Sequence, residues 1–270
     1  MDYHEFMHSG DAAAIDKLKH IPLLDKALNL VMKFGVEEYC RGMFLANHIR
    51  LSPRQLPRVY NLLPPICETL GVDIPELYLG LDPQPNAFTV GNKRNFIVIT
   101  SGLLDALADE EEIRVVLAHE CGHVACRHVF YSTMIQAMFN LASQNTVLAG
   151  MMVALRSSLS LAFNAWLRMS ELSADRAASV CLGEIVTPIR TLLRLSGGSA
   201  KCMKDINLDE YAEQMMESEG MQAGSKWQNM LREFVEMDEE HPYTVTRIKE
   251  LMCWGRDSKF QTIIKRPTVS

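Results

Sequence analysis

The chain has 270 residues, 48% of them hydrophobic and 22% charged, a composition that excludes disordered, collagen-like and coiled-coil chains. Its formal charge is −6, from 27 basic and 33 acidic residues, so we expect no nucleic-acid partner. The seven cysteines are scattered and form no CxxC pair, which is typical of a reducing compartment. Since the first residues lack a secretory signal, we expect a cytoplasmic protein that is not secreted.

The first part of the chain combines predicted helices with three short strands. Residues 12–50 have a helical pattern that Pro22 and Gly35 interrupt, and a further helix is expected over 59–70, where Gly71 ends it. Extended segments follow at 76–81, 86–91 and 95–100, and the last contains FIVIT, a continuous apolar run typical of a buried strand. We therefore expect one small sheet in a mainly helical chain.

After the strands, the pattern returns to helix. Asp109 and Glu112 form a predicted capping box at the start of a helix that we expect to run to about Phe130. Further helices are predicted at 158–182, 186–195, 207–219, 225–237 and 243–254. This order suggests an N-terminal helical segment (1–54), a main domain (55–255) and a C-terminal tail (256–270).

One segment raises the question of a membrane. The residues from Val129 to Leu155 carry no charge, and the segment is long enough to span a bilayer. Polar residues such as Gln136 and Asn140 interrupt it and weaken the signal for insertion. A buried or interfacial helix pair is the simpler interpretation, and peripheral membrane contact through residues 130–166 stays open.

The helix predicted after Asp109 contains a candidate metal site, the sequence HECGH at 119–123. His119 and His123 are spaced i and i+4, so both imidazoles lie on one helical face and can bind one ion. Zinc accepts neutral imidazole nitrogens and keeps an open position in catalytic sites. Glu120 is placed to act as a general base on a zinc-activated water. The alternative is a pair of histidines with only a structural role.

A later helix offers a third ligand, since Glu171 and Asp175 are also spaced i and i+4. One carboxylate can bind the metal while the other accepts a hydrogen bond from the far nitrogen of a metal-binding histidine. Small and apolar neighbours suggest a buried helix, where two unpaired carboxylates would be costly, and Arg176 is a candidate to neutralise part of their charge. The alternative is an ordinary solvated acidic face.

HECGH followed some fifty residues later by ELSAD resembles the gluzincin metallopeptidases. Three further motifs narrow the resemblance: the NAF sequence at 86–88, TSGLL at 100–104, and His241-Pro242 with Arg247 downstream. Together they are similar to the HtpX-like and CAAX-prenyl-protease-like zinc metallopeptidases. The resemblance covers about residues 55–255, and it implies a zincin-type α+β fold, mainly helical, with one small sheet.

The resemblance also implies roles for individual residues. It implies one zinc ion per chain bound by His119, His123 and Glu171, with Glu120 as the base and Asp175 orienting a histidine. Asn86, Ala87 and Phe88 would form a strand that receives the substrate as an added strand, and otherwise they are only a sheet edge. His241 would face the metal, where it either stabilises the oxyanion or keeps the enzyme latent; otherwise it only precedes a helix that starts at Pro242.

Other reactive side chains are given structural roles. We expect Cys121 and Cys126 to be small core residues, because helical spacing turns Cys121 away from the face of the two histidines. The histidines at 4, 8, 20, 48 and 128 are not spaced to form a site with other reactive residues, and we expect them to have structural roles as well.

The expected function is that of a zinc metalloendopeptidase, which hydrolyses internal peptide bonds of unfolded or extended polypeptide segments. One alternative is a latent or chaperone-like zinc-stabilised module that binds such segments without turnover. Because both proteins would bind metal, only turnover separates them. A third interpretation is a membrane-surface scaffold that uses residues 130–166. The sequence predicts neither the oligomeric state nor the role of the first 54 residues.

Overall fold

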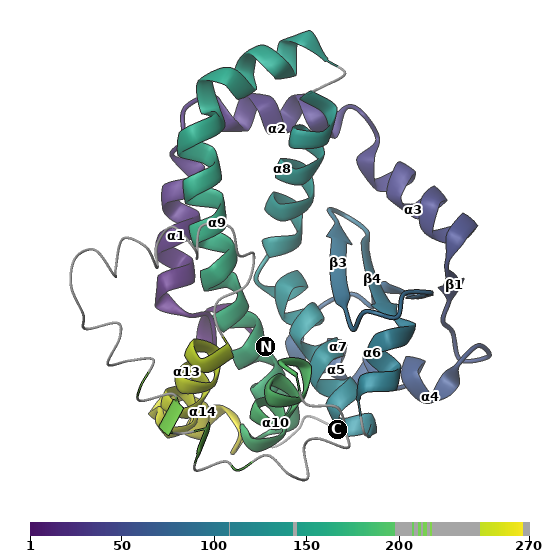
Figure 1. Cartoon of the computed structure of the whole chain (residues 1–270), viewed down its shortest axis with the longest axis vertical. Coiled ribbons are helices and arrows are strands. Elements are labelled where there is room, and N and C mark those ends of the chain that lie inside the picture. The colour runs from purple at the N-terminus through teal and green to yellow at the C-terminus, as the bar shows by residue number, and fades with distance from the viewer. Residues whose placement is uncertain are drawn as a thin grey trace.

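A computed structural model describes residues 1–107, 109–142, 145–197 and 244–266, together with 207, 210–211, 213–214 and 217, and without the side chains of 152–158. In this part of the chain, helices predominate and a single small sheet lies to one side of them (Figure 1). The prediction of a mainly helical α+β fold with one small sheet is therefore confirmed.

The sheet has four strands in the order β1-β2-β4-β3. They are β1 (Ile49–Arg50), β2 (Glu76–Gly80), β3 (Ala87–Gly91) and β4 (Asn95–Thr100). The predicted FIVIT strand is central, and its last five residues are buried. It pairs parallel to β2 and antiparallel to β3, so β3 forms one edge of the sheet. The two-residue β1 was not predicted, because it is too short to show an alternating pattern and follows directly on a helix.

The N-terminal helices break where the sequence predicts. After a 3-10 turn (Tyr3–Glu5), they are α1 (Ser9–Lys19), α2 (Leu24–Met32) and α3 (Val36–Asn47), with breaks at Pro22 and Gly35. The single helix predicted over 59–70 is wrong in one respect, because it is split into α4 (Pro57–Tyr60) and α5 (Leu63–Leu70). Prolines in the first turn of each helix favour two separate starts.

The central helices are α6 (Ser101–Ala106), α7 (Glu110–Ala125), α8 (His128–Ala142) and α9 (Thr146–Leu182). The prediction that α7 would reach Phe130 is wrong, because the chain turns at Arg127, which has a left-handed φ of 61°. The helix predicted at 158–182 is the second half of the 37-residue α9. The uncharged segment therefore forms α8 and the start of α9, which agrees with a helix pair.

The chain continues through α10 (Val186–Leu195), α13 (Thr244–Arg256) and α14 (Ser258–Ile263). The helices predicted at 186–195 and 243–254 are confirmed. Those predicted at 207–219 and 225–237 lie outside the described residues except for a few single positions. No helix in the described part of the chain is both long enough and apolar enough to cross a membrane.

The two largest hydrophobic cores among the described residues hold most of the helices together. The first joins the sheet to α5, α7 and the end of α9, and includes Leu77, Ile97 and Leu117. The second lies between α2, α8 and α9 around the buried ring of Trp166. Helix α1 runs beside α9, so the N-terminal residues pack against the helix that carries Glu171 and Asp175 (Figure 1).

Candidate metal and catalytic site

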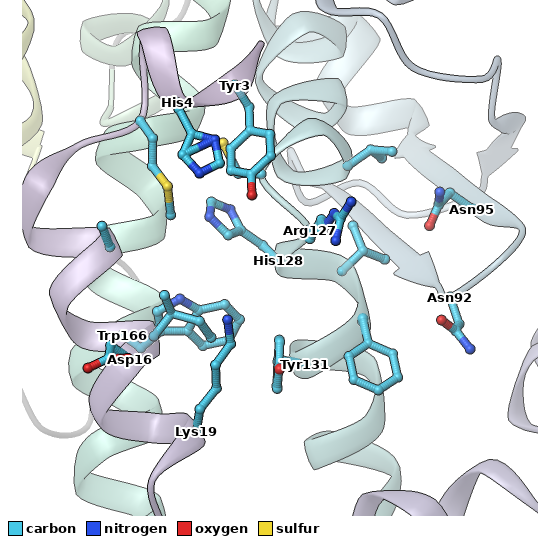
Figure 2. Close-up of a pocket in the computed structure, with 17 residues that line it drawn as sticks. Tyr3, His4, Asp16, Lys19, Asn92, Asn95, Arg127, His128, Tyr131 and Trp166 are labelled. Carbon is cyan, nitrogen blue, oxygen red and sulfur yellow. The ribbon is translucent and has the colours of Figure 1, made fainter. Parts of the chain in front are cut away.

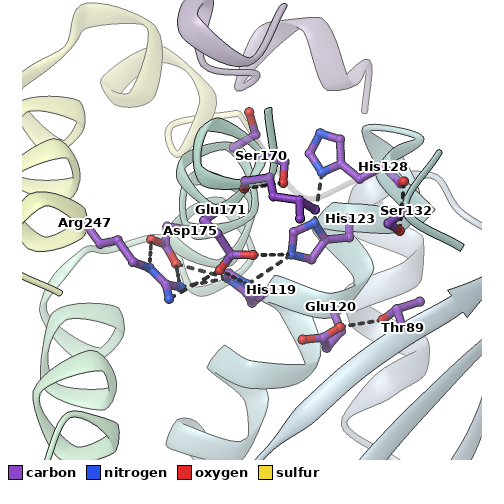
Figure 3. Close-up of polar contacts among 12 residues, drawn as sticks. Thr89, His119, Glu120, His123, His128, Ser132, Ser170, Glu171, Asp175 and Arg247 are labelled. Atoms are coloured by element: carbon purple, nitrogen blue, oxygen red, sulfur yellow. Dashed lines mark hydrogen bonds and ion pairs between the residues drawn. The ribbon is translucent and has the colours of Figure 1, made fainter. Parts of the chain in front are cut away.

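His119, His123 and Glu171 converge at the point where α7 crosses α9 (Figure 3). The Nε2 atoms of the two histidines are 3.2 Å apart. Glu171 Oε2 lies 3.3 Å from Nε2 of His119, and Glu171 Oε1 lies 3.3 Å from Nε2 of His123. The structure thus brings together the three residues that the sequence predicts as ligands. Two imidazole nitrogens and a carboxylate are a donor set that suits zinc.

Gly122, between the two histidines, permits this close crossing. A Cβ atom at position 122 would lie 2.7 Å from the Cβ of Ala177 and 3.1 Å from the Cα of Ala174 on α9. These contacts are shorter than van der Waals distance, so any larger residue would push the helices apart. Small residues on both helices therefore allow the carboxylate on α9 to reach the histidines on α7.

Asp175, one turn after Glu171, connects His119 to Arg247 on α13. Its Oδ1 lies 3.0 Å from Nδ1 of His119. Arg247 donates to both carboxylate oxygens of Asp175, at 2.8 and 2.6 Å, and its Nη1 lies 3.3 Å from Glu171 Oε2. The sequence-based role of Arg176 is wrong, because its guanidinium lies over the ring of Trp254. The charge-neutralising residue is Arg247, which the sequence analysis noted only as part of a motif.

The electrostatics of this cluster favour a bound cation. Burial alone would lower the pKa of His119, but the carboxylates of Glu171 and Asp175 outweigh it and raise that pKa to about 10. Burial alone would raise the pKa of Glu171, yet the charges of His119 and Arg247 hold it well below its usual value. Glu171 is therefore ionised at neutral pH, as a metal ligand must be.

Glu120 points toward the sheet rather than toward α9 (Figure 3). Its Oε2 accepts a hydrogen bond of 2.5 Å from the hydroxyl of Thr89 on β3. The Glu120 side chain also lines a cavity of about 280 Å³, together with His119, Asn86 and Ala87. The predicted base and the predicted substrate strand thus share one cavity. Thr89 was not predicted, since only the pairing of β3 with its neighbours brings it beside α7.

The NAF residues do not all face this cavity. Asn86 and Ala87 line it, whereas the ring of Phe88 lies against Phe44, with centroids 6.4 Å apart. Alternate side chains of a strand point to opposite faces, so Thr89 and Phe88 lie on opposite sides of the sheet. The side chain of Phe88 therefore belongs to the face that α3 covers.

A second cavity, of about 650 Å³, lies on the other side of the site, between α1 and the start of α8 (Figure 2). Asn92, which directly follows β3, borders it, as do Lys19, Arg127 and His128. Strand β3 thus extends from the first cavity, at Ala87, to the second, beyond Gly91.

His128, which the sequence analysis gave only a structural role, contacts a candidate metal ligand. Its Nδ1 lies 2.9 Å from Nδ1 of His123, and its Nε2 lies 2.8 Å from Oδ2 of Asp11. The spacing of five residues between the two histidines does not indicate a contact on one helix. The turn at Arg127 creates it. Cys121 and Cys126 are buried in the core, as expected. His241 lies outside the described residues.

Comparison with known proteins agrees with this site. Residues 69–254 match Peptidase family M48. The chain is 28% identical over 268 residues to the plastoglobule-localized metallopeptidase 48 of Arabidopsis thaliana, covering 98% of this chain and 76% of that protein. It is 39% identical over 88 residues to a protease HtpX homolog of Tropheryma whipplei, but this match covers only 32% of this chain and 30% of that protein. A solved structure, S. mikatae Ste24p, matches with a TM-score of 0.41 at 16% identity, covering 65% of this chain and 44% of that one.

Proposed function

Since the chain belongs to peptidase family M48, it is a peptidase, and we propose that it is a zinc-dependent endopeptidase with His119, His123 and Glu171 as metal ligands. The observation that carries this proposal is the convergence of both Nε2 atoms and both Glu171 oxygens at distances of 3.2–3.3 Å. Zinc bound there would act as a Lewis acid, polarising the scissile carbonyl and acidifying water.

Glu120 is proposed as the general base. It takes a proton from the attacking water and then gives it to the leaving amine. The hydroxyl of Thr89 binds one carboxylate oxygen of Glu120, which fixes the orientation of the group and leaves the other oxygen to meet water. Arg247 and Asp175 support the ligands through their contacts with Glu171 and His119.

The proposed substrate is an extended polypeptide that adds to the edge of β3. The carbonyl of Asn86 accepts from the N–H of Thr100, so the antiparallel alternation directs the backbone groups of Ala87 and Thr89 away from β4. The N–H of Gly91 already donates to Thr133, so the backbone groups of Ala87 and Thr89 are those that a substrate strand would pair with, next to Glu120. Because strand addition needs an extended backbone, unfolded or misfolded segments are the expected substrates.

His241 retains its proposed role of assisting the oxyanion or blocking the metal. In the sequence it precedes α13 by three residues, and α13 carries Arg247 into the site. That short connection to a residue of the ligand cluster supports a place for His241 near the metal.

The test is cleavage of an unfolded, dye-labelled model protein by the zinc-loaded chain and by Glu120→Gln. We expect the wild type to cut, and the variant to bind one zinc ion per chain without cutting. If the wild type and Glu120→Gln both hold zinc and neither cuts, the latent or chaperone-like alternative replaces the endopeptidase. If neither holds zinc, the ligand assignment fails.

A second, additional property is peripheral membrane contact inside the cell, through residues 130–166. Phe139 on α8, and Val147 and Leu161 on α9, are exposed, with Val147 at 60%. The name of the Arabidopsis relative places that protein at plastoglobules, which supports a membrane-associated location for this chain. The test is co-sedimentation with liposomes, which Val147→Asp with Leu161→Asp should abolish. Val186→Asp changes a valine on α10 that is at least as exposed and should have no effect. Equal binding by the wild type, the double variant and Val186→Asp would exclude this surface.

A further inference from the structure

We propose that Asp11 on α1 is a positioning residue of the metal site, which acts through His128 to set the tautomer and the orientation of His123. The inference rests on the proposed function in one respect, that His123 is a metal ligand. Asp11 lies outside the family match at 69–254, so the inference gives the N-terminal helix α1 a role in the metal site.

The carboxylate of Asp11 is fully buried and is held by three side chains from two other helices. Its Oδ2 accepts from the hydroxyl of Ser173 at 2.6 Å and lies 2.8 Å from Nε2 of His128. Its Oδ1 accepts from the indole N–H of Trp166 at 3.1 Å. Because α9 supplies two of these donors and α8 the third, the carboxylate has one fixed position.

The position of the carboxylate determines where the protons lie. An ionised carboxylate only accepts hydrogen bonds, so Nε2 of His128 must be its donor. A second proton on Nδ1 would make His128 a cation in a fully buried site beside a metal ligand, which is unfavourable. The neutral ring therefore accepts at Nδ1, and the donor across the 2.9 Å contact is Nδ1 of His123.

This arrangement leaves the lone pair of His123 on Nε2. That atom lies 3.2 Å from Nε2 of His119 and 3.3 Å from Glu171 Oε1, at the point where a metal would bind. Asp175 does the same for His119 by a direct contact with its Nδ1. The two ligands thus have matching supports, one a carboxylate and the other a carboxylate that acts through a histidine.

A purely structural role for Asp11, in packing α1 against α9, is the alternative, and Asp11→Asn separates the two. In this variant, the amide has one accepting oxygen for the two positions that the carboxylate fills, and the orientation that keeps the bond from Trp166 turns the NH2 group toward His128. The NH2 group then faces Nε2 of His128 and donates to it, which moves the proton of His128 to Nδ1. His123 can no longer donate from Nδ1, so its proton moves to Nε2, the atom that would bind zinc.

The measurement is the zinc dissociation constant of the full-length chain, by competition with a chelator of known affinity. We expect Asp11→Asn to weaken zinc binding by about 10–100-fold, the usual effect of losing such a support. Asp175→Asn should do the same, and Asp16→Asn, an exposed aspartate on the same helix, should not. The visible spectrum of the cobalt-substituted chain should change with Asp11→Asn and not with Asp16→Asn.

Coupling between the two residues gives an independent check that does not depend on Asp11→Asn alone. His128→Gln removes the connection, so adding Asp11→Asn to it should weaken zinc binding little further. An Asp11→Asn chain with a lower melting temperature but unchanged zinc affinity and cobalt spectrum would overturn the inference. His123→Ala identifies the cause of a failure: if it too binds zinc normally, the proposed metal site itself is wrong.

Discussion

Arg247 and Asp175 form a bidentate ion pair, with Nε 2.8 Å from Oδ2 and Nη2 2.6 Å from Oδ1. The side chain of Arg247 is 13% exposed and that of Asp175 is 6% exposed. Since Asp175 also contacts His119, a residue near the end of the chain supports a ligand on α7 through α9. Docking of α13 and assembly of the metal site should therefore be coupled.

Arg247→Ala should destabilise the chain strongly. It leaves Asp175 and Glu171 buried without their cation, and breaking a buried ion pair by removing one partner costs about 3–5 kcal/mol. Urea unfolding measures this loss. Arg247→Lys should lose less, because it keeps the charge but not the paired hydrogen bonds. Arg266→Ala breaks an exposed ion pair with Glu5 and should barely move the midpoint. An unchanged midpoint in Arg247→Ala would contradict the role given to this pair.

Thr89→Val should reduce turnover without preventing substrate binding. Valine has nearly the same shape as threonine but cannot donate to Glu120, so the base loses the contact that orients it. We expect kcat to fall by about 10-fold or more while KM changes little, since positioned general bases contribute about 10²–10⁴-fold. Thr89→Ser keeps the hydroxyl and should restore most of the rate. Equal kcat values for Val and Ser would show that this hydrogen bond is unimportant.

Gly122→Val should force α7 away from α9. Its Cβ alone would overlap Ala177, and overpacking of this kind costs about 1–3 kcal/mol. Because the ligands come from both helices, zinc stoichiometry should fall together with the free energy of unfolding. Gly42→Val is the matched helical control, since nothing lies within 4 Å of a Cβ at that position. If Gly122→Val bound zinc normally, the close crossing would not be needed for the site.

Glu76 on β2 should contribute to the loss of folding stability at acid pH. Partial burial raises its pKa, but hydrogen bonds from Tyr78 and Arg41 outweigh burial and hold it below the usual value of 4.5. A carboxylate with a lowered folded-state pKa stabilises the fold above its unfolded value and loses this effect as the pH falls through the folded value. The stability difference between wild type and Glu76→Gln should therefore be constant above about pH 5 and shrink below it. Urea unfolding from pH 3 to 7 measures it, with the exposed Glu68→Gln as the charge control.

Removal of metal should lower the melting temperature. A ligand that binds only the folded chain stabilises it by about 4 kcal/mol when its free concentration is 1,000 times its dissociation constant. Thermal denaturation with and without a chelator measures the shift, and adding zinc back should reverse it. His123→Ala should melt at the same temperature in both conditions. A chelator shift of equal size in that variant would place the stabilising metal elsewhere.

Local spacing made most of the candidate site predictable. His119 and His123 lie one helical turn apart, as do Glu171 and Asp175, and the 3.6-residue period of a helix places each pair on one face whatever the fold. The buried strand at 95–100 was predictable for a similar local reason, because a run of β-branched residues suits a strand covered on both faces. The end of α7 could not be predicted, since the turn at Arg127 depends on a left-handed backbone conformation that the local sequence does not indicate.

The sequence by itself thus determined the two pairs of candidate side chains, His119 with His123 and Glu171 with Asp175, because the spacing within each pair depends on a single helical turn. Only the tertiary structure decided what supports them. Asp11 meets His128 across 117 residues of chain, and Arg247 meets Asp175 across 72. Such contacts depend on how α1 and α13 pack against α9, and packing arises from the summed burial of many apolar side chains rather than from any spacing along the chain.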